Sequence, residues 1–331
     1  MDLYAVSNNN ISEPPIDISS SILKFPSNFH QTSIEFIRAL VFLFIPGELF
    51  YFAIYFLLKR RYVLHNILTF LSLMVVWISP FVTPVKSNSS RAMLNLGIFV
   101  SSMKILDLWA RRNALPVYKV EEKPSDWLLS LLLMTELRYE SFAPSYARLP
   151  KGLENMNQTR VYCIHAAALA TLHAISRHHP ILLAFEILLP PLFAPLYLAD
   201  SLTGFWSEVW HNCFTSPCIS LAYNPLRNGL RKLGLPDGIS RSAGVLGAFS
   251  LMSVFHMYCM YPILDQKAVN RIGLFFFLNG IATLAETAIW GKKRHWAKAT
   301  LAWTFQTILA TWVASSINLP SNTLTILWNE A

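Results

Sequence analysis

Long apolar runs, separated by short polar or basic stretches, set the first limit on how this chain can fold. A helix needs about 20 mostly apolar residues to cross the hydrocarbon core of a membrane. Such segments occur at 35–58, 62–85, 92–110, 160–177, 180–199, 242–262, 270–290 and 298–318. Charged residues make up only 14% of the chain, whereas a soluble domain carries roughly a quarter. The sequence therefore predicts an all-α, polytopic membrane protein of about eight transmembrane helices.

The two ends of the chain differ from these runs. Residues 1–34 form a polar tail that lacks the basic start and apolar core of a cleavable signal peptide. Residues 321–331 form a short C-terminal tail. Between them we expect one membrane-embedded domain, residues 35–320, whose first span directs insertion. The short apolar stretch 125–135 is expected to lie in the membrane interface or to re-enter the membrane.

Lysine and arginine residues are distributed unequally between the loops on the two sides. Loops 59–61, 111–160, 200–241 and 291–298 hold 19 of the 27, and the loops on the opposite side hold 7. Because positively charged loops stay in the cytosol, we expect both termini in the lumen. The net charge of +8 does not indicate nucleic acid, since the basic residues form no patch interleaved with aromatic residues. Membrane lipids are the expected surroundings.

Asn10, Asn88 and Asn157 head glycosylation sequons. In the expected topology the first two face the lumen and the third faces the cytosol. Use of the first two would make the chain a glycoprotein and would test the topology.

Two histidines are the strongest candidates for chemistry. His211 ends the segment Phe205-Trp206-Ser207-Glu208-Val209-Trp210-His211, whose aromatic residues recur at helical spacing and form one apolar face. His256 stands 45 residues later, inside the apolar run 242–262. A titratable ring at membrane depth is costly to leave unpaired, so it indicates function by default. Together the two rings indicate proton chemistry in a membrane cavity.

Structural roles for both histidines remain open. The segment 205–214 is also typical of a helix that lies in the headgroup region, with Trp206 and Trp210 as anchors and His211 at its polar edge. His256, with Ser253 one helical turn before it, is also explained by one hydrogen bond between helices. Gly244 and Gly247 on the same segment allow a helix or a ligand to approach closely.

Other polar residues also fall at membrane depth. Lys104 and Asp107, three residues apart, are expected to neutralise each other within one helix. Glu286 is expected to reach His256 if their helices pack together. The remaining polar residues at this depth are Glu48, Glu186, Asn279 and Gln306. Taken singly, each is more typical of a hydrogen bond that holds helices together.

Several classes of enzyme find no support in the sequence. His211, Cys213 and Cys218 match no standard zinc spacing and lack a fourth ligand, so no metal is expected. The chain has no Gly-rich phosphate loop, no Gly-x-Ser-x-Gly elbow and no Asp-rich motif of a metal-dependent prenyl enzyme.

The aromatic segment resembles a known family signature. Phe205-Trp206-x-x-x-Trp210-His211 is similar to the Phe-Trp-x-x-x-Trp-His signature of wax-synthase-like proteins, a branch of the membrane-bound O-acyltransferase (MBOAT) superfamily. The stretch 195–202 resembles the lead-in to that signature, and the apolar segment with His256 resembles its second signature. The resemblance covers roughly 190–290, and the remaining helices resemble the family only in hydropathy. The family usually has Gly-Arg-Arg between the tryptophans, whereas this chain has Ser-Glu-Val, so a basic pair suited to an anionic donor is absent.

This resemblance implies a helical chamber that acyl-CoA enters from the cytosol and a role as an O-acyltransferase. His256 matches the catalytic histidine and would act as the general base, while His211 would polarise or position the donor. Substrate-binding roles are expected for Phe205, Trp206, Trp210, Ser253 and Glu286. The chain resembles compact fungal enzymes of this branch that acetylate terpenoid or other secondary metabolites. Acetyl-CoA and a lipophilic alcohol are therefore the expected substrates, and the endoplasmic reticulum is the expected location.

Three alternatives remain open. A long-chain wax or sterol ester synthase would use the same residues with a longer acyl donor. A membrane-embedded terpenoid cyclase or isomerase would need no CoA ester and would depend on Glu48, Asp107 and Glu286. A transporter or receptor would need the histidines only to hold helices together.

Overall fold

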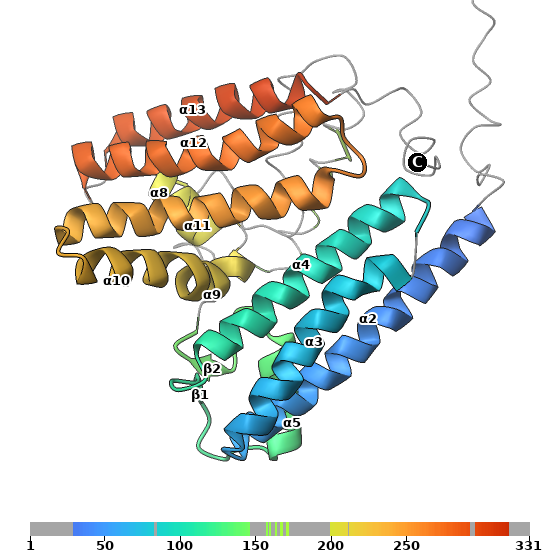
Figure 1. Ribbon diagram of the computed structural model, residues 1–331. Helices are drawn as coiled ribbons and strands as arrows, with labels where there is room; N and C mark the ends of the chain where they lie inside the picture. The colour runs from blue at the N-terminus through green and yellow to red at the C-terminus, as the bar shows by residue number, and fades with distance from the viewer. Residues whose placement is uncertain are drawn as a thin grey trace, which may run out of the picture.

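The computed structural model describes residues 29–82, 85–145, 199–210, 212–291 and 295–317, with a few single positions between 157 and 171. Within these ranges the long elements are helices, and turns and loops join them; β1 (Val117–Tyr118) and β2 (Phe142–Ala143) form a short antiparallel strand pair. Five of the described helices are long and apolar enough to cross a membrane. The prediction of an all-α polytopic membrane protein is thereby confirmed (Figure 1).

The first group of helices corresponds to the first three apolar runs. It contains α2 (Phe29–Leu58), α3 (Tyr62–Val82), α4 (Asn88–Ala110) and the shorter α5 (Asp126–Thr135). Helices α2, α3 and α4 lie side by side, and α5 packs on α2 (Figure 1). Helix α2 begins at Phe29, within the predicted polar tail, because its polar first turns are hydrogen-bonded: the Glu35 carboxylate accepts from the Gln31 side chain and the Lys86 N–H.

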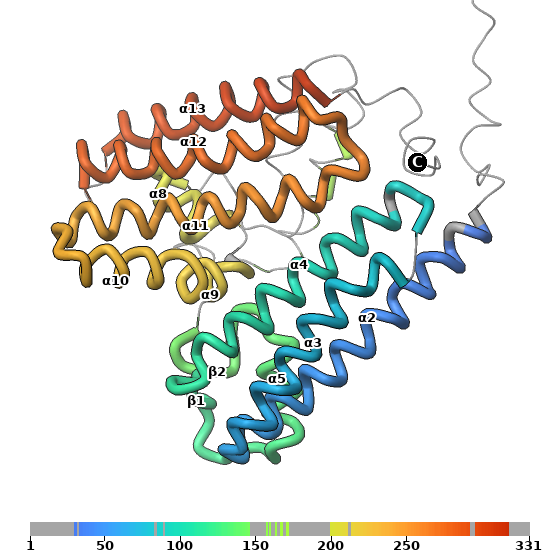
Figure 2. Tube along the Cα trace, in the orientation of Figure 1, coloured from blue at the N-terminus to red at the C-terminus, as the bar shows by residue number. Residues whose placement is uncertain are grey.

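The second group follows the chain from residue 202. It begins with short pieces: α8 (Leu202–Gly204), η3 (Phe205–Val209), η4 (Asn212–Phe214), α9 (Thr215–Pro217), η5 (Cys218–Tyr223) and α10 (Asn224–Lys232). Three long helices follow: α11 (Asp237–Met260), α12 (Gln266–Trp290) and α13 (Trp296–Ala314). Figure 2 shows α11 and α12 as an antiparallel hairpin with α13 beside α12.

Two of the predicted spans, 160–177 and 180–199, fall almost entirely outside the described residues. The predicted span 298–318 corresponds to α13, which has 19 residues and is less apolar than the five candidate spans. The predicted apolar stretch 125–135 is the 10-residue helix α5, which is too short to cross a membrane.

Helix α4 contributes to both hydrophobic cores of the described protein. Its first set of apolar side chains packs with α2, α3 and α5: Leu94, Ile98, Ile105 and Leu108. Its second set packs with α11 and the segment around 205–214: Leu96, Phe99, Val100 and Met103. A helix that is apolar on most of its circumference is buried rather than amphipathic. The Asn95 side chain also donates to the Tyr258 carbonyl of α11, so α4 joins the two groups.

The predicted Lys104–Asp107 pair is not what the structure shows. The Lys104 ammonium donates to the Glu136 carbonyl at 2.7 Å and lies 3.7 Å from the centre of the Tyr139 ring. The Asp107 carboxylate pairs instead with the Arg111 guanidinium at 2.8 Å. The Lys104 side chain extends toward the loop after α5. The Arg111 side chain, at the C-terminal cap of α4, reaches back to the Asp107 carboxylate. The prediction failed because it considered helix spacing alone.

The packing of α11 on η5 depends on glycine at position 244. A Cβ there would lie 2.9 Å from the Tyr223 carbonyl oxygen and 2.7 Å from the Tyr223 ring. We predict that Gly244→Ala lowers the free energy of unfolding by about 1–3 kcal/mol, the usual cost of overpacking. Thermal unfolding of the purified protein in detergent measures this effect.

Gly238→Ala is the matched control, because it lies on the same helix and a Cβ there meets nothing within 4 Å. This control should leave stability unchanged or raise it slightly, since alanine favours helix. Equal losses from both variants would contradict the packing argument.

Candidate functional site

The aromatic signature segment is anchored at its start by Glu286 of α12. The Glu286 carboxylate accepts from the Leu202 N–H at 2.7 Å, the Thr203 N–H at 3.1 Å and the Thr203 hydroxyl at 3.0 Å. These N–H groups begin α8 and have no partner within the helix, so a carboxylate satisfies them well. The Lys298 ammonium lies 3.6 Å from the same carboxylate. Glu286 therefore holds the signature segment in place.

The signature residues continue from α8 as a π-helical turn, η3. The Trp210 N–H donates to the Phe205 carbonyl, five residues back. Single π-helical turns of this kind are rare and occur frequently at functional sites. The turn stacks the Phe205 ring on the Trp210 ring, with centroids 5.4 Å apart, and places the Trp206 and Trp210 rings 5.3 Å apart.

A buried amide fixes the orientation of Trp206. The Asn279 side-chain oxygen accepts from the Trp206 indole N–H at 3.1 Å and from the Gln306 amide at 2.7 Å. Asn279 has no exposed surface, and Gln306 is 1% exposed. Helices α12 and α13 thus use two polar residues at membrane depth to hold one tryptophan of the signature.

Next to these tryptophans lies an apolar cavity of about 320 Å³. Trp206 and Trp210 form one side of it, and Phe276 of α12 lies beside them. Helix α11 contributes Val245, Ala248, Phe249 and Met252. The segment after the signature contributes Phe214, Thr215, Cys218, Ile219 and Tyr223. The cavity thus lies between the signature turn, the α11–α12 hairpin and the segment 214–223.

His256 continues the α11 face that lines this cavity, one helical turn beyond Met252. Its Nδ1 lies 2.8 Å from the Met252 carbonyl oxygen, and its ring stacks on Phe276 with centroids 3.9 Å apart. A carbonyl only accepts, so in the neutral ring Nδ1 carries the proton and Nε2 carries the lone pair. This is the tautomer that a general base needs.

The structure brings together some of the predicted site residues and separates others. Trp206 and Trp210 line the cavity, and His256 follows its α11 wall. Phe205 is 2% exposed and packs in the core behind the tryptophans. The Ser253 hydroxyl donates to the Gly273 carbonyl and faces a separate groove between α11 and α12. His211 lies outside the described residues.

Glu286 has different partners from those we expected, because its oxygens are engaged with α8 and Lys298 rather than directed along the hairpin toward His256. Phe276 and the segment 214–223 are the parts of the cavity that sequence reasoning missed. Apolar residues within a span look alike in a sequence, so no signal distinguishes Phe276 from Phe275 or Phe277. Among the described residues, no group of three His, Cys, Asp or Glu side chains is placed to hold a metal ion.

The site overlaps the part of the chain that matches a known family. Residues 189–278 match the model of the membrane bound O-acyl transferase family, and this range contains the signature turn, η5 and most of the α11–α12 hairpin. No solved structure matches the chain.

The chain is also similar to proteins of Arabidopsis thaliana. It is 25% identical to "Probable long-chain-alcohol O-fatty-acyltransferase 1" over 147 residues, which are 44% of this chain and 42% of the relative. It is 34% identical to "Probable long-chain-alcohol O-fatty-acyltransferase 9" over 101 residues, which are 30% of this chain and 29% of the relative. The matched stretches thus span less than half the length of either relative.

The buried amide of Asn279 supports a test of the site's architecture. We predict that Asn279→Leu lowers the free energy of unfolding by about 1–3 kcal/mol, because the Trp206 and Gln306 donors lose their acceptor. Thermal unfolding in detergent measures the loss, and tryptophan fluorescence reports on the ring environment.

Asn270→Leu, at an exposed position of the same helix, provides the control. A surface change of this kind should stay within about 0.5 kcal/mol of the parent protein. Equal stability of the two variants would show that the Asn279 amide does not hold the signature turn.

Proposed function

We propose that this chain is a membrane-embedded O-acyltransferase that moves an acyl group from acyl-CoA to the hydroxyl of a lipophilic alcohol. The observation that carries this proposal is the position of His256. Its imidazole follows the wall of an apolar cavity, and its Nδ1–H is held by the Met252 carbonyl. The match of residues 189–278 to an acyltransferase family and the names of the relatives support the same reaction.

The reaction requires a base, because an alcohol attacks a thioester poorly until its proton is removed. Nε2 of His256 takes that proton as the alcohol oxygen bonds to the thioester carbon. The tetrahedral intermediate then collapses, the C–S bond breaks, and the CoA thiolate recovers the proton from the imidazolium. We assign His211, as the resemblance implies, to positioning the donor or to donating a hydrogen bond to the developing oxyanion.

The apolar cavity supports a hydrophobic substrate. Its lining is dominated by tryptophan, phenylalanine and aliphatic side chains, which suit hydrocarbon and offer few polar partners. Our more detailed proposal is acetyl-CoA as donor and a terpenoid or other secondary-metabolite alcohol as acceptor. The names of the relatives favour a second candidate, a long-chain fatty acyl donor with a long-chain alcohol.

We place the protein in the endoplasmic reticulum with its basic loops in the cytosol. The basic loop 59–61 and the start of α5 lie together, since the Lys59 ammonium and the Asp126 carboxylate are 2.7 Å apart. This contact supports the proposal that loop 59–61 and the connection after α4 lie on the same side of the membrane, as the positive-inside rule predicts for basic loops.

Replacement of the proposed base tests the function directly. Microsomes that contain the chain are incubated with labelled acetyl-CoA or palmitoyl-CoA and a panel of lipophilic alcohols. We predict that His256→Ala lowers the rate of ester formation by about 10²–10⁴-fold, the usual contribution of general base catalysis. The donor that yields labelled ester distinguishes the two candidates.

His295→Ser serves as the control, because His295 is an exposed helix cap and serine preserves the capping role. This variant should retain the parent rate at equal protein level. Full turnover by His256→Ala, or no ester from any donor with the inserted parent protein, would refute the proposal.

A further inference from the structure

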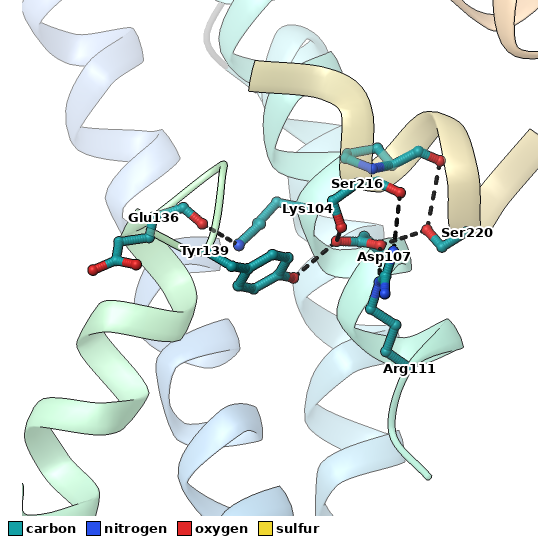
Figure 3. A network of polar contacts seen from close by, with 8 residues as sticks. Lys104, Asp107, Arg111, Glu136, Tyr139, Ser216 and Ser220 are labelled. Carbon is teal, nitrogen blue, oxygen red and sulfur yellow. Dashed lines mark hydrogen bonds and ion pairs between the residues drawn. The ribbon is translucent and has the colours of Figure 1, made fainter. Parts of the chain in front are cut away.

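A buried carboxylate ties the cavity wall to α4 (Figure 3). Asp107 has no exposed surface. One of its oxygens accepts from the Ser216 hydroxyl at 2.7 Å and the Tyr139 hydroxyl at 2.8 Å. The other accepts from the Arg111 guanidinium at 2.8 Å and from the Ser220 hydroxyl. Three separate parts of the chain therefore meet at one carboxylate.

The two serines belong to the segment that forms part of the cavity. Ser216 and Ser220 are four residues apart, so they share the side of α9 and η5 that faces α4. Thr215, Cys218 and Ile219, which alternate with them, line the cavity. The segment 215–223 is therefore a thin wall, with substrate space on one side and the Asp107 carboxylate on the other.

The wall also contacts Arg111, the residue that pairs with Asp107. The Arg111 guanidinium, paired with Asp107, also donates to the Ser216 carbonyl at 3.3 Å. A charged group that is buried must keep its hydrogen bonds, because losing them costs far more than losing those of an exposed group. Any shift of the wall away from α4 and into the cavity would remove donors from a carboxylate that water does not reach.

We propose that Asp107 is a positioning residue that sets the width of the substrate cavity, and thereby the acyl-chain selectivity, by holding the segment 215–223 through Ser216 and Ser220. The proposal rests on the acyl-transfer function proposed above. It assigns to Asp107 no contact with substrate. The residue acts through the wall, so its loss changes which acyl group fits before it changes the chemical step.

The network offers a matched pair of variants that separate this role from general stability. The double variant Ser216→Ala, Ser220→Ala cuts the link between Asp107 and the wall. Tyr139→Phe cuts another hydrogen bond to the same carboxylate, but Tyr139 follows α5 and does not line the cavity. Both changes remove hydroxyls that donate to Asp107 and leave the Asp107–Arg111 pair in place.

The first measurement compares kcat/KM for palmitoyl-CoA and acetyl-CoA in the parent and both variants. We expect the ratio of the two values to change by about fivefold or more in the double-serine variant, which is the scale of a lost hydrogen bond or two. The ratio should stay within about twofold of the parent in Tyr139→Phe. Equal changes in both variants, or no change in either, would overturn the proposal.

The second measurement needs no turnover. Burial, with the nearby Asp107 carboxylate, raises the pKa of the Cys218 thiol to about 12, so N-ethylmaleimide reacts with it slowly. Peptide mass spectrometry of the full-length protein in detergent measures the labelling rate. We expect about fivefold faster labelling of Cys218 in the double-serine variant and a parent-like rate in Tyr139→Phe.

These two readouts separate the two claims. A parent protein that transfers no acyl group, but whose Cys218 labels faster only in the double-serine variant, refutes the proposed function and supports the wall contact. A parent-like labelling rate in the double-serine variant refutes the positioning role whatever the activity.

Discussion

The fully buried carboxylate of Asp107 is the interaction on which the arrangement of the described helices depends. Taking a charge out of water costs several kcal/mol unless its hydrogen bonds are replaced, and Asp107 is supplied by Arg111, Tyr139, Ser216 and Ser220. Those partners come from the C-terminal cap of α4, from the turn after α5 and from the wall of the cavity. Apolar packing of α4 against both cores brings the two groups together, whereas the carboxylate defines their register.

Around the cavity, too, apolar packing and buried polar groups have separate roles. Aromatic and aliphatic side chains provide the space, and single buried polar groups fix the parts that must not move. Asn279 orients Trp206, Glu286 holds the start of the signature turn, and the Met252 carbonyl selects the His256 tautomer. A membrane interior has little water to compensate for a misplaced polar group, so each of these contacts has a strong preference for one geometry.

Sequence reasoning located the helices and the signature but not the partners of the polar residues. The apolar runs predicted α2, α3, α4, α11 and α12 because helix length and hydropathy are local properties. Apart from Arg111 and Lys298, the partners of Lys104, Asp107 and Glu286 lie 32 to 113 residues away along the chain, and helix spacing carries no information about such contacts. The π-helical turn at 205–209 could not be predicted either, because its sequence is equally typical of an ordinary amphipathic helix.

The central claim is that the cavity beside Trp206 and Phe276 is where the acyl group meets the acceptor under the control of His256. A structure by electron cryo-microscopy with a non-hydrolysable thioether analogue of acyl-CoA tests this claim most directly. The account predicts the alkyl chain within the cavity and the carbon that replaces the carbonyl within about 7 Å of His256 Nε2, leaving room for one alcohol oxygen. An analogue bound in the groove beside Ser253, or elsewhere far from His256, would contradict it.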